Sequence, residues 1–238
     1  MITMIFKRKI YSKLSAWKKE VNGKKALLIE GARRIGKSTI VEEFAKNEYK
    51  SYLLIDFARV SEDVKSYFHL YLDDLDTFYM LLSAQYGVQL HPRESVIVFD
   101  EIQMFPRARE AIKYLVADGR YDFIETGSLI SIKENVKDIV IPSEERHIKM
   151  YPLDFEEFCA ALGEETLTKY IRDCFEKKLP LERSLHNKAM LLFKQYLLVG
   201  GMPMSVVAFL EGQKDFGKAD LEKRDILELY RNDIMKIR

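Results

Sequence analysis

The sequence has few residues of the kinds that hold metals or form disulfides. Its 238 residues include only two cysteines, Cys159 and Cys174, and four histidines. The cysteines lack the spacing of metal ligands, so there is no zinc cluster to assemble. We expect two reduced thiols, as in cytosolic proteins. An apolar content of 47% is enough for a hydrophobic core, so neither a metal nor a disulfide is needed to hold the fold.

Long apolar runs and an excess of charge of one sign are also missing. No apolar stretch is long enough to span a bilayer. The N-terminus places its few apolar residues before its basic ones, which is the reverse of a secretory signal. With 38 basic and 37 acidic residues the net charge is +1, so bulk charge does not support nucleic-acid or membrane binding, although a local basic patch stays open. We expect a cytoplasmic protein without membrane segments.

Short apolar runs alternate with helical patterns in the first part of the chain. Residues 26–29, 52–55, 96–99 and 123–124 are typical of buried strands, and residues 146–151 are a weaker candidate for a fifth strand. Helical patterns lie at residues 7–20, after the turn at residues 31–39, at 61–86 with a break near 73–74, and at 106–116. Continuously apolar strands that alternate with helices predict an α/β fold with a mostly parallel sheet covered on both faces.

The character of the sequence changes near Tyr151. Beyond it only helical patterns occur, at residues 154–162, 164–177, 185–199, 203–210 and 221–237. We therefore expect a core at residues 1–151 and an all-helical appendage at residues 152–238. The last residues continue a helical pattern without a stop signal, which suggests a fragment of a longer protein.

A glycine-rich turn joins the first predicted strand to the next helix. Residues 31–38 fit the pattern G-x-x-x-x-G-K-[ST] without a gap: Gly31, Ala32, Arg33, Arg34, Ile35, Gly36, Lys37 and Ser38. The glycines let the backbone turn and approach a polyanion closely, so that consecutive N–H groups can surround it. Lys37 supplies charge for the β- and γ-phosphates, the Ser38 hydroxyl ligates magnesium, and Thr39 can reach the α-phosphate region. The alternative is an ordinary glycine turn.

Two acids follow the third apolar strand. Asp100 emerges at the carboxyl end of residues 96–99, where ligands bind in open α/β sheets, and its carboxylate can hold Mg²⁺. Glu101 can accept a proton from the water that attacks the γ-phosphate, which favours hydrolysis over binding alone. The Asn-Lys-x-Asp motif of GTPases is absent, which argues against a GTPase.

Thr126 and Ser128 end the fourth predicted strand. Either hydroxyl can polarise the attacking water or touch the γ-phosphate, and Thr126 is the stronger candidate. The alternative is that both are turn and helix-cap residues.

With these residues in hand, the chain resembles the AAA-type P-loop ATPases of bacteria and archaea, in particular the subgroup whose loop reads Gly-x-Arg-Arg-x-Gly-Lys-Ser. The resemblance extends over residues 31–39, 96–103, 126–128, 151–158, 198–203 and 230–234. It implies a five-stranded sheet with the phosphate-loop strand between its neighbours, a helical lid, and a C-terminal domain that this sequence lacks. It also implies that Pro203 approaches the adenine, although a helix-breaking turn without nucleotide contact is an alternative.

The sequence departs from an ATPase pattern at one point, because it shows no clearly placed arginine finger. Arg33, Arg34, Arg146 and Arg231 are candidates. Either a neighbouring copy or partner supplies the finger, or turnover is slow. We therefore expect Mg²⁺-dependent ATP hydrolysis to ADP, coupled to a conformational change in an attached domain or partner. The alternatives are a nucleotide-dependent switch with negligible hydrolysis and a DNA-associated ATPase.

Overall fold

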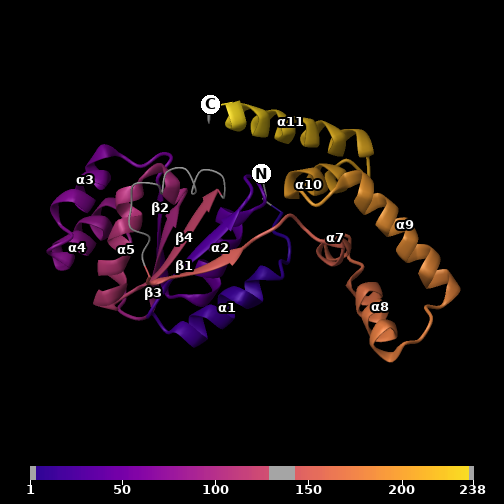
Figure 1. Ribbon diagram of the computed structural model, residues 1–238, viewed down its shortest axis with the longest axis horizontal. Coiled ribbons are helices and arrows are strands. Elements are labelled where there is room, and N and C mark those ends of the chain that lie inside the picture. Colours follow the sequence, from indigo (N-terminus) through magenta and orange to yellow (C-terminus); the bar gives the residue numbers. More distant parts are fainter. Residues whose placement is uncertain (1–3, 129–142, 236–238) are drawn as a thin grey trace. The chain divides into compact units, whose positions relative to one another are not determined.

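A computed structural model describes residues 4–128 and 143–235 (Figure 1). The chain forms two compact units. The first, the α/β unit, runs from Ile10 to Met150; the second, the helical unit, combines the segment before Ile10 with the chain from Tyr151 onward.

A five-stranded sheet forms the centre of the α/β unit, with the strand order β2-β3-β4-β1-β5. All neighbouring strands are parallel. The strands are β1 Ala26–Gly31, β2 Ser51–Asp56, β3 Ser95–Asp100, β4 Asp122–Ser128 and β5 Glu145–Lys149. β3 and β4 are buried along their whole length, because helices cover both faces of a parallel sheet. The predicted five-stranded α/β fold is confirmed, and β1 lies between β4 and β5 as expected.

Two helices of the α/β unit, which follow Ser61 and Asp74, begin at side-chain caps. The helices of this unit are α1 Ile10–Val21, α2 Lys37–Glu48, α3 Glu62–Leu70, α4 Leu75–Tyr86, the 3₁₀ turn η1 Ile102–Met104 and α5 Pro106–Asp118. The expected break near residues 73–74 is present, since the Asp74 side chain accepts a hydrogen bond from the Thr77 N–H at 3.2 Å and so caps α4. Helices α3, α4 and α5 pack on one face of the sheet through an aromatic core in which Phe68, Phe78 and Phe99 are fully buried. This core holds the carboxyl ends of the strands in fixed positions.

The helical unit contains α7 Phe155–Ala161, α8 Glu165–Lys177, α9 Arg183–Val199, α10 Pro203–Glu211 and α11 Phe216–Met235. The predicted all-helical appendage is confirmed. α9 begins two residues earlier than expected, because the Glu182 carboxylate accepts from the Ser184 and Leu185 N–H groups and caps it. Within residues 4–128 and 143–235 no single helix has the length and apolar composition to cross a membrane, and the pair α9–α10, bent by 116°, meets that description only when taken together.

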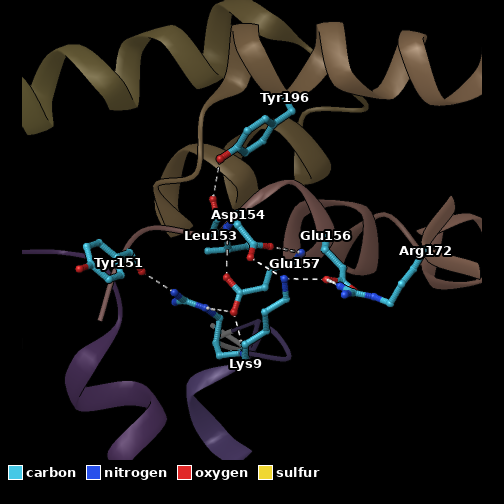
Figure 2. Close-up of polar contacts among 9 residues, drawn as sticks. Lys9, Tyr151, Leu153, Asp154, Glu156, Glu157, Arg172 and Tyr196 are labelled. Carbon is cyan, nitrogen blue, oxygen red and sulfur yellow. Dashed lines mark hydrogen bonds and ion pairs between the residues drawn. The ribbon is translucent and has the colours of Figure 1, made fainter. Parts of the chain in front are cut away.

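The described residues before Ile10 pack with the helical unit, whereas the sequence analysis places them in the core at residues 1–151. Arg8 explains the difference, because its Nε lies 3.3 Å from Glu157 and its Nη2 donates to the Tyr151 carbonyl at 2.6 Å. Lys9 adds ion pairs of 2.6 Å with Asp154 and with Glu156 (Figure 2). These partners are about 150 positions away in the sequence. The chain therefore passes between the units twice, after Lys9 and after Met150.

Candidate nucleotide-binding site

The predicted phosphate loop connects β1 to α2. Gly31 has no room for a side chain there, since a Cβ atom would lie 2.5 Å from the Met150 carbonyl oxygen and 2.5 Å from Ile35 Cδ1. Gly36 has a φ of 90°, in the left-handed region that glycine adopts without strain. The structure therefore requires glycine at both positions of the motif. After Gly36 the chain turns directly into the N-terminus of α2. Such a terminus presents unpaired N–H groups to an anion.

Lys37, the first residue of α2, is only 5% exposed. Its Nζ donates to the Gly31 carbonyl at 3.1 Å and to the Ala32 carbonyl at 2.8 Å. Burial lowers the pKa of Lys37, and the nearby carboxylates of Glu101 and Asp100 act in the opposite direction. A buried ammonium whose partners are two neutral carbonyls gains strongly from a bound anion, because an anion compensates its charge.

Three predicted residues meet at one oxygen atom. The Ser38 hydroxyl donates to Asp100 Oδ1 at 2.8 Å, and the Thr126 hydroxyl donates to the same atom. The residues come from the start of α2, the end of β3 and the end of β4. Since β4 lies between β1 and β3, parallel pairing brings these carboxyl ends together. A hydroxyl and a carboxylate at this distance offer the hard oxygen ligands that Mg²⁺ prefers.

Glu101 lies directly after β3 in a left-handed backbone conformation, with a φ of 53°. Its N–H donates to Thr126 Oγ1 at 3.4 Å. Its carboxylate accepts a hydrogen bond from the side-chain amide of Gln103, which is itself buried. The sequence analysis did not assign a role to Gln103. The signal that could have identified it is a polar amide inside the otherwise apolar stretch of residues 102–105.

The other predicted loop residues differ in exposure. Ile35 is buried, while the side chains of Ala32, Arg33, Arg34 and Thr39 are exposed. Arg34 adopts a left-handed conformation with a φ of 62°. Besides Lys37, the main-chain N–H groups of the loop are suited to bind phosphate.

Four further candidates lie elsewhere in the chain. Ser128 is buried at the end of β4, opposite Gly31 in the strand register. Arg146 forms an ion pair with Glu20 at 2.7 Å. Pro203 and Arg231 belong to α10 and α11 of the helical unit. An adenine contact for Pro203 and a finger role for any arginine stay predictions.

A second group of charged residues, which the sequence analysis missed, is buried beside β4. Arg109 of α5 binds both carboxylate oxygens of Glu145 at 2.9 and 2.7 Å, and the exposed ring of His147 lies 3.1 Å from Glu145. Glu125 of β4, fully buried, belongs to the same group. Burial and the negative charge of Glu145 raise the pKa of Glu125 well above the usual range for glutamate, although Arg109 acts in the opposite direction. Glu125 immediately precedes Thr126 in β4, so the two side chains point to opposite faces of the sheet.

A parallel sheet, a glycine turn into a helix, a buried lysine and a carboxylate at a strand end together define a P-loop nucleoside-triphosphate-binding fold. The chain belongs to the AAA domain family, whose sequence profile matches residues 23–159. That range includes the loop, Asp100, Glu101 and Thr126.

Comparison with curated proteins finds no match. Among solved structures, a Walker-type ATPase of Pyrococcus abyssi is similar with a TM-score of 0.49 and 18% identity, covering 98% of this chain and 74% of that one. PCH-2 of C. elegans is similar with a TM-score of 0.45 and 11% identity, covering 96% and 70%. The ORC1 protein of Aeropyrum pernix, solved in complex with DNA, has a TM-score of 0.41 and 11% identity, covering 83% and 68%.

Proposed function

We propose that this AAA domain binds ATP together with Mg²⁺ and hydrolyses the β–γ phosphoanhydride bond. The observation that carries the proposal is the meeting of Ser38 and Thr126 at the Asp100 carboxylate, in the same unit as the buried Lys37. In the part of the chain that the structure describes, no group of three or more His, Cys, Asp or Glu side chains could hold a metal by itself. We propose that Ser38 and Asp100 bind Mg²⁺ together with phosphate oxygens and water.

The residues of the site suggest how hydrolysis proceeds. Lys37 exchanges its bonds to the Gly31 and Ala32 carbonyls for the β- and γ-phosphate oxygens, while the loop N–H groups bind the phosphate chain. Glu101 accepts a proton from a water molecule as the water oxygen bonds to the γ-phosphorus. The bond from that phosphorus to the β–γ bridging oxygen breaks at the same time, and its electrons stay on ADP. Ser38 and Asp100 would hold Mg²⁺, which would supply positive charge against the phosphates.

Hydrolysis is proposed to change the conformation of an attached domain or partner. Because an ATPase of this kind uses an arginine to stabilise the transferred phosphoryl group, a neighbouring copy or partner is proposed to supply it. Pro203 is proposed to contact the adenine. A nucleotide-dependent switch with negligible hydrolysis is the second candidate, favoured by the lack of a clearly placed arginine finger in the sequence.

Nucleotide binding is tested by thermal shift with ATP, GTP and ADP, with and without Mg²⁺. A ligand bound only by the native state raises the melting temperature, and we expect the largest increase with ATP and Mg²⁺. Lys37→Ala should weaken ATP affinity by about 10- to 100-fold, since a hydrogen bond to a charged group is worth about 1.5–3 kcal/mol. Lys46→Ala is the matched control, because Lys46 is an exposed lysine of the same helix, paired with Glu42 at 2.7 Å. Unchanged ATP affinity in Lys37→Ala would contradict the proposed site.

Turnover is tested by phosphate release. We expect Glu101→Gln to lower kcat by at least about 100-fold while ATP affinity stays within a few-fold of wild type, because only the proton acceptor is lost. Glu110→Gln, on α5 and paired with Arg107 at 3.3 Å, is the control. A wild-type protein that binds ATP and releases no phosphate would end the hydrolysis proposal in favour of the switch.

A further inference from the structure

Gln103 is a buried amide in a turn whose other residues, Ile102 and Met104, are apolar. Its neighbours Ile102 and Phe105 contribute to the aromatic core of the α/β unit, and Gln103 itself is only 7% exposed. Burying an amide is unfavourable unless it forms hydrogen bonds. The side-chain Nε2 of Gln103 donates to Glu101 Oε2, two residues earlier in the chain. The Gln103 amide is therefore hydrogen-bonded to the carboxylate that accepts the proton in the proposed reaction.

The backbone of Glu101 is already anchored on both sides. Its N–H donates to Thr126 Oγ1 at 3.4 Å, and its carbonyl accepts from the Met104 N–H at 2.9 Å. Its left-handed φ of 53° is unfavourable for a residue with a Cβ atom and persists because these contacts hold it. The direction of the carboxylate is then set by the side-chain torsions, which are the part of Glu101 that the backbone contacts leave free. The hydrogen bond from Gln103 restricts these torsions.

The chemistry of glutamine suits this task. Its NH₂ group donates a hydrogen bond and carries no charge, so it orients the carboxylate without neutralising it. A lysine or arginine in its place would form an ion pair with the proton acceptor, and a leucine would leave it without an oriented partner. The bond engages one carboxylate oxygen of Glu101, Oε2.

We propose that Gln103 is a positioning residue, which holds the Glu101 carboxylate in the orientation that accepts a proton from the attacking water. This inference rests on the proposed ATP hydrolysis. A purely structural role in the η1 turn is the competing explanation, and it differs in one respect. A positioning role acts only through Glu101 and on the chemical step, whereas a structural role affects folding and nucleotide binding as well.

The test measures kcat, KM and ATP affinity for wild type and Gln103→Leu, with circular dichroism melts as a check on folding. We expect kcat to fall by about 10- to 100-fold with KM and ATP affinity within about twofold of wild type, because a small misplacement of a catalytic group can cost about 100-fold in rate. Gln85→Leu, on the exposed surface of α4, is the control. A kcat equal to that of wild type, or an affinity that falls as much as kcat, would overturn the positioning role.

A double-mutant cycle keeps the inference testable if Gln103→Leu is less stable. Glu101→Asp shortens the acid by one methylene and moves its carboxylate away from Gln103, while keeping a measurable rate. If Gln103 acts through Glu101, adding Gln103→Leu to Glu101→Asp lowers kcat by less than about threefold further. An additive loss would show that Gln103 acts independently of Glu101. Wild type without turnover refutes the proposed function and the inference with it, whereas active wild type with an equally active Gln103→Leu variant refutes the inference alone.

Discussion

Glu125 shows how much a single residue can affect the stability of the α/β unit. Its side chain is fully buried, and the Arg109 guanidinium nearby is already bonded to both oxygens of Glu145. Burial and Glu145 raise the pKa of Glu125 well above the usual range. In the unfolded chain the same group has the ordinary glutamate pKa of about 4.3, so above that pH the native state binds a proton that the unfolded state has lost. The free energy of unfolding therefore falls as pH rises through this window.

Glu125→Gln is expected to remove this pH dependence. Relative to wild type, the variant should gain stability between pH 5 and pH 8, by at most about 1.4 kcal/mol per pH unit. Urea unfolding at both pH values, followed by the fluorescence of the single tryptophan, Trp17, which is buried in the same unit, measures the effect. Glu110→Gln serves as the control, and parallel pH profiles for wild type and Glu125→Gln would refute the prediction.

At the scale of elements, the β1–loop–α2 connection is constrained most tightly at Gly31. The backbone of Met150, which directly follows β5, occupies the space in which a side chain would lie. The crowding comes from the backbone of a different strand connection, so it cannot be relieved by a change of side-chain rotamer. The close approach places the loop at the carboxyl ends of β1 and β5.

Gly31→Ala is expected to lower the free energy of unfolding by about 1–3 kcal/mol, the range typical of overpacking, and to weaken ATP binding. Gly119→Ala provides the comparison, because Gly119 has a φ of 73° but nothing within 4 Å of its Cβ position. That variant should lose about 1 kcal/mol from backbone strain alone and keep its ATP affinity. Urea unfolding and thermal shift with ATP measure both quantities. Equal ATP affinity in the two variants would contradict the argument.

At the scale of the whole molecule, the chain contributes two separate segments to the helical unit. Phe6 packs on the core formed by Leu153, Phe158 and Phe209. Arg8 and Glu157 form an ion pair in which their side chains are 7% and 8% exposed. Glu157 also completes the cap of α7, where it accepts from the Asp154 N–H at 3.1 Å (Figure 2). The N-terminal segment is therefore part of the helical unit and contributes to its stability.

Arg8→Ala is expected to destabilise the helical unit by about 3–5 kcal/mol, because removing one partner leaves the other as an uncompensated buried charge. Hydrogen exchange of the α7 amides measures this loss, and the Trp17-reported stability of the α/β unit should change little. Lys7→Ala is the control, since Lys7 pairs with Glu165 while 81% exposed and should contribute less than about 1 kcal/mol. If the α7 amides are equally protected from hydrogen exchange in the two variants, the buried Arg8–Glu157 pair stabilises the helical unit no more than the exposed pair does.

Most of the correct predictions about the fold came from local patterns in the sequence. The glycine motif, the apolar strand that ends at Asp100 and Glu101, and the helix breaks depend on residues close together in the sequence, so the α/β fold and the helical appendage were predicted correctly. The number of five strands was implied by the family resemblance. The positions of Ser38 and Thr126 around Asp100 follow once strands are paired in parallel, because the carboxyl ends of neighbouring parallel strands share one edge.

Only the tertiary structure decided which side chains meet across long sequence separations or in unusual backbone conformations. The left-handed turn at Glu101 brings the Gln103 amide to its carboxylate, and no periodic pattern encodes that conformation. Arg109, Glu125 and Glu145 come from three elements, and Arg8 reaches Glu157 from the far end of the chain. Such contacts depend on how the chain closes on itself, which local propensity and apolar spacing do not specify.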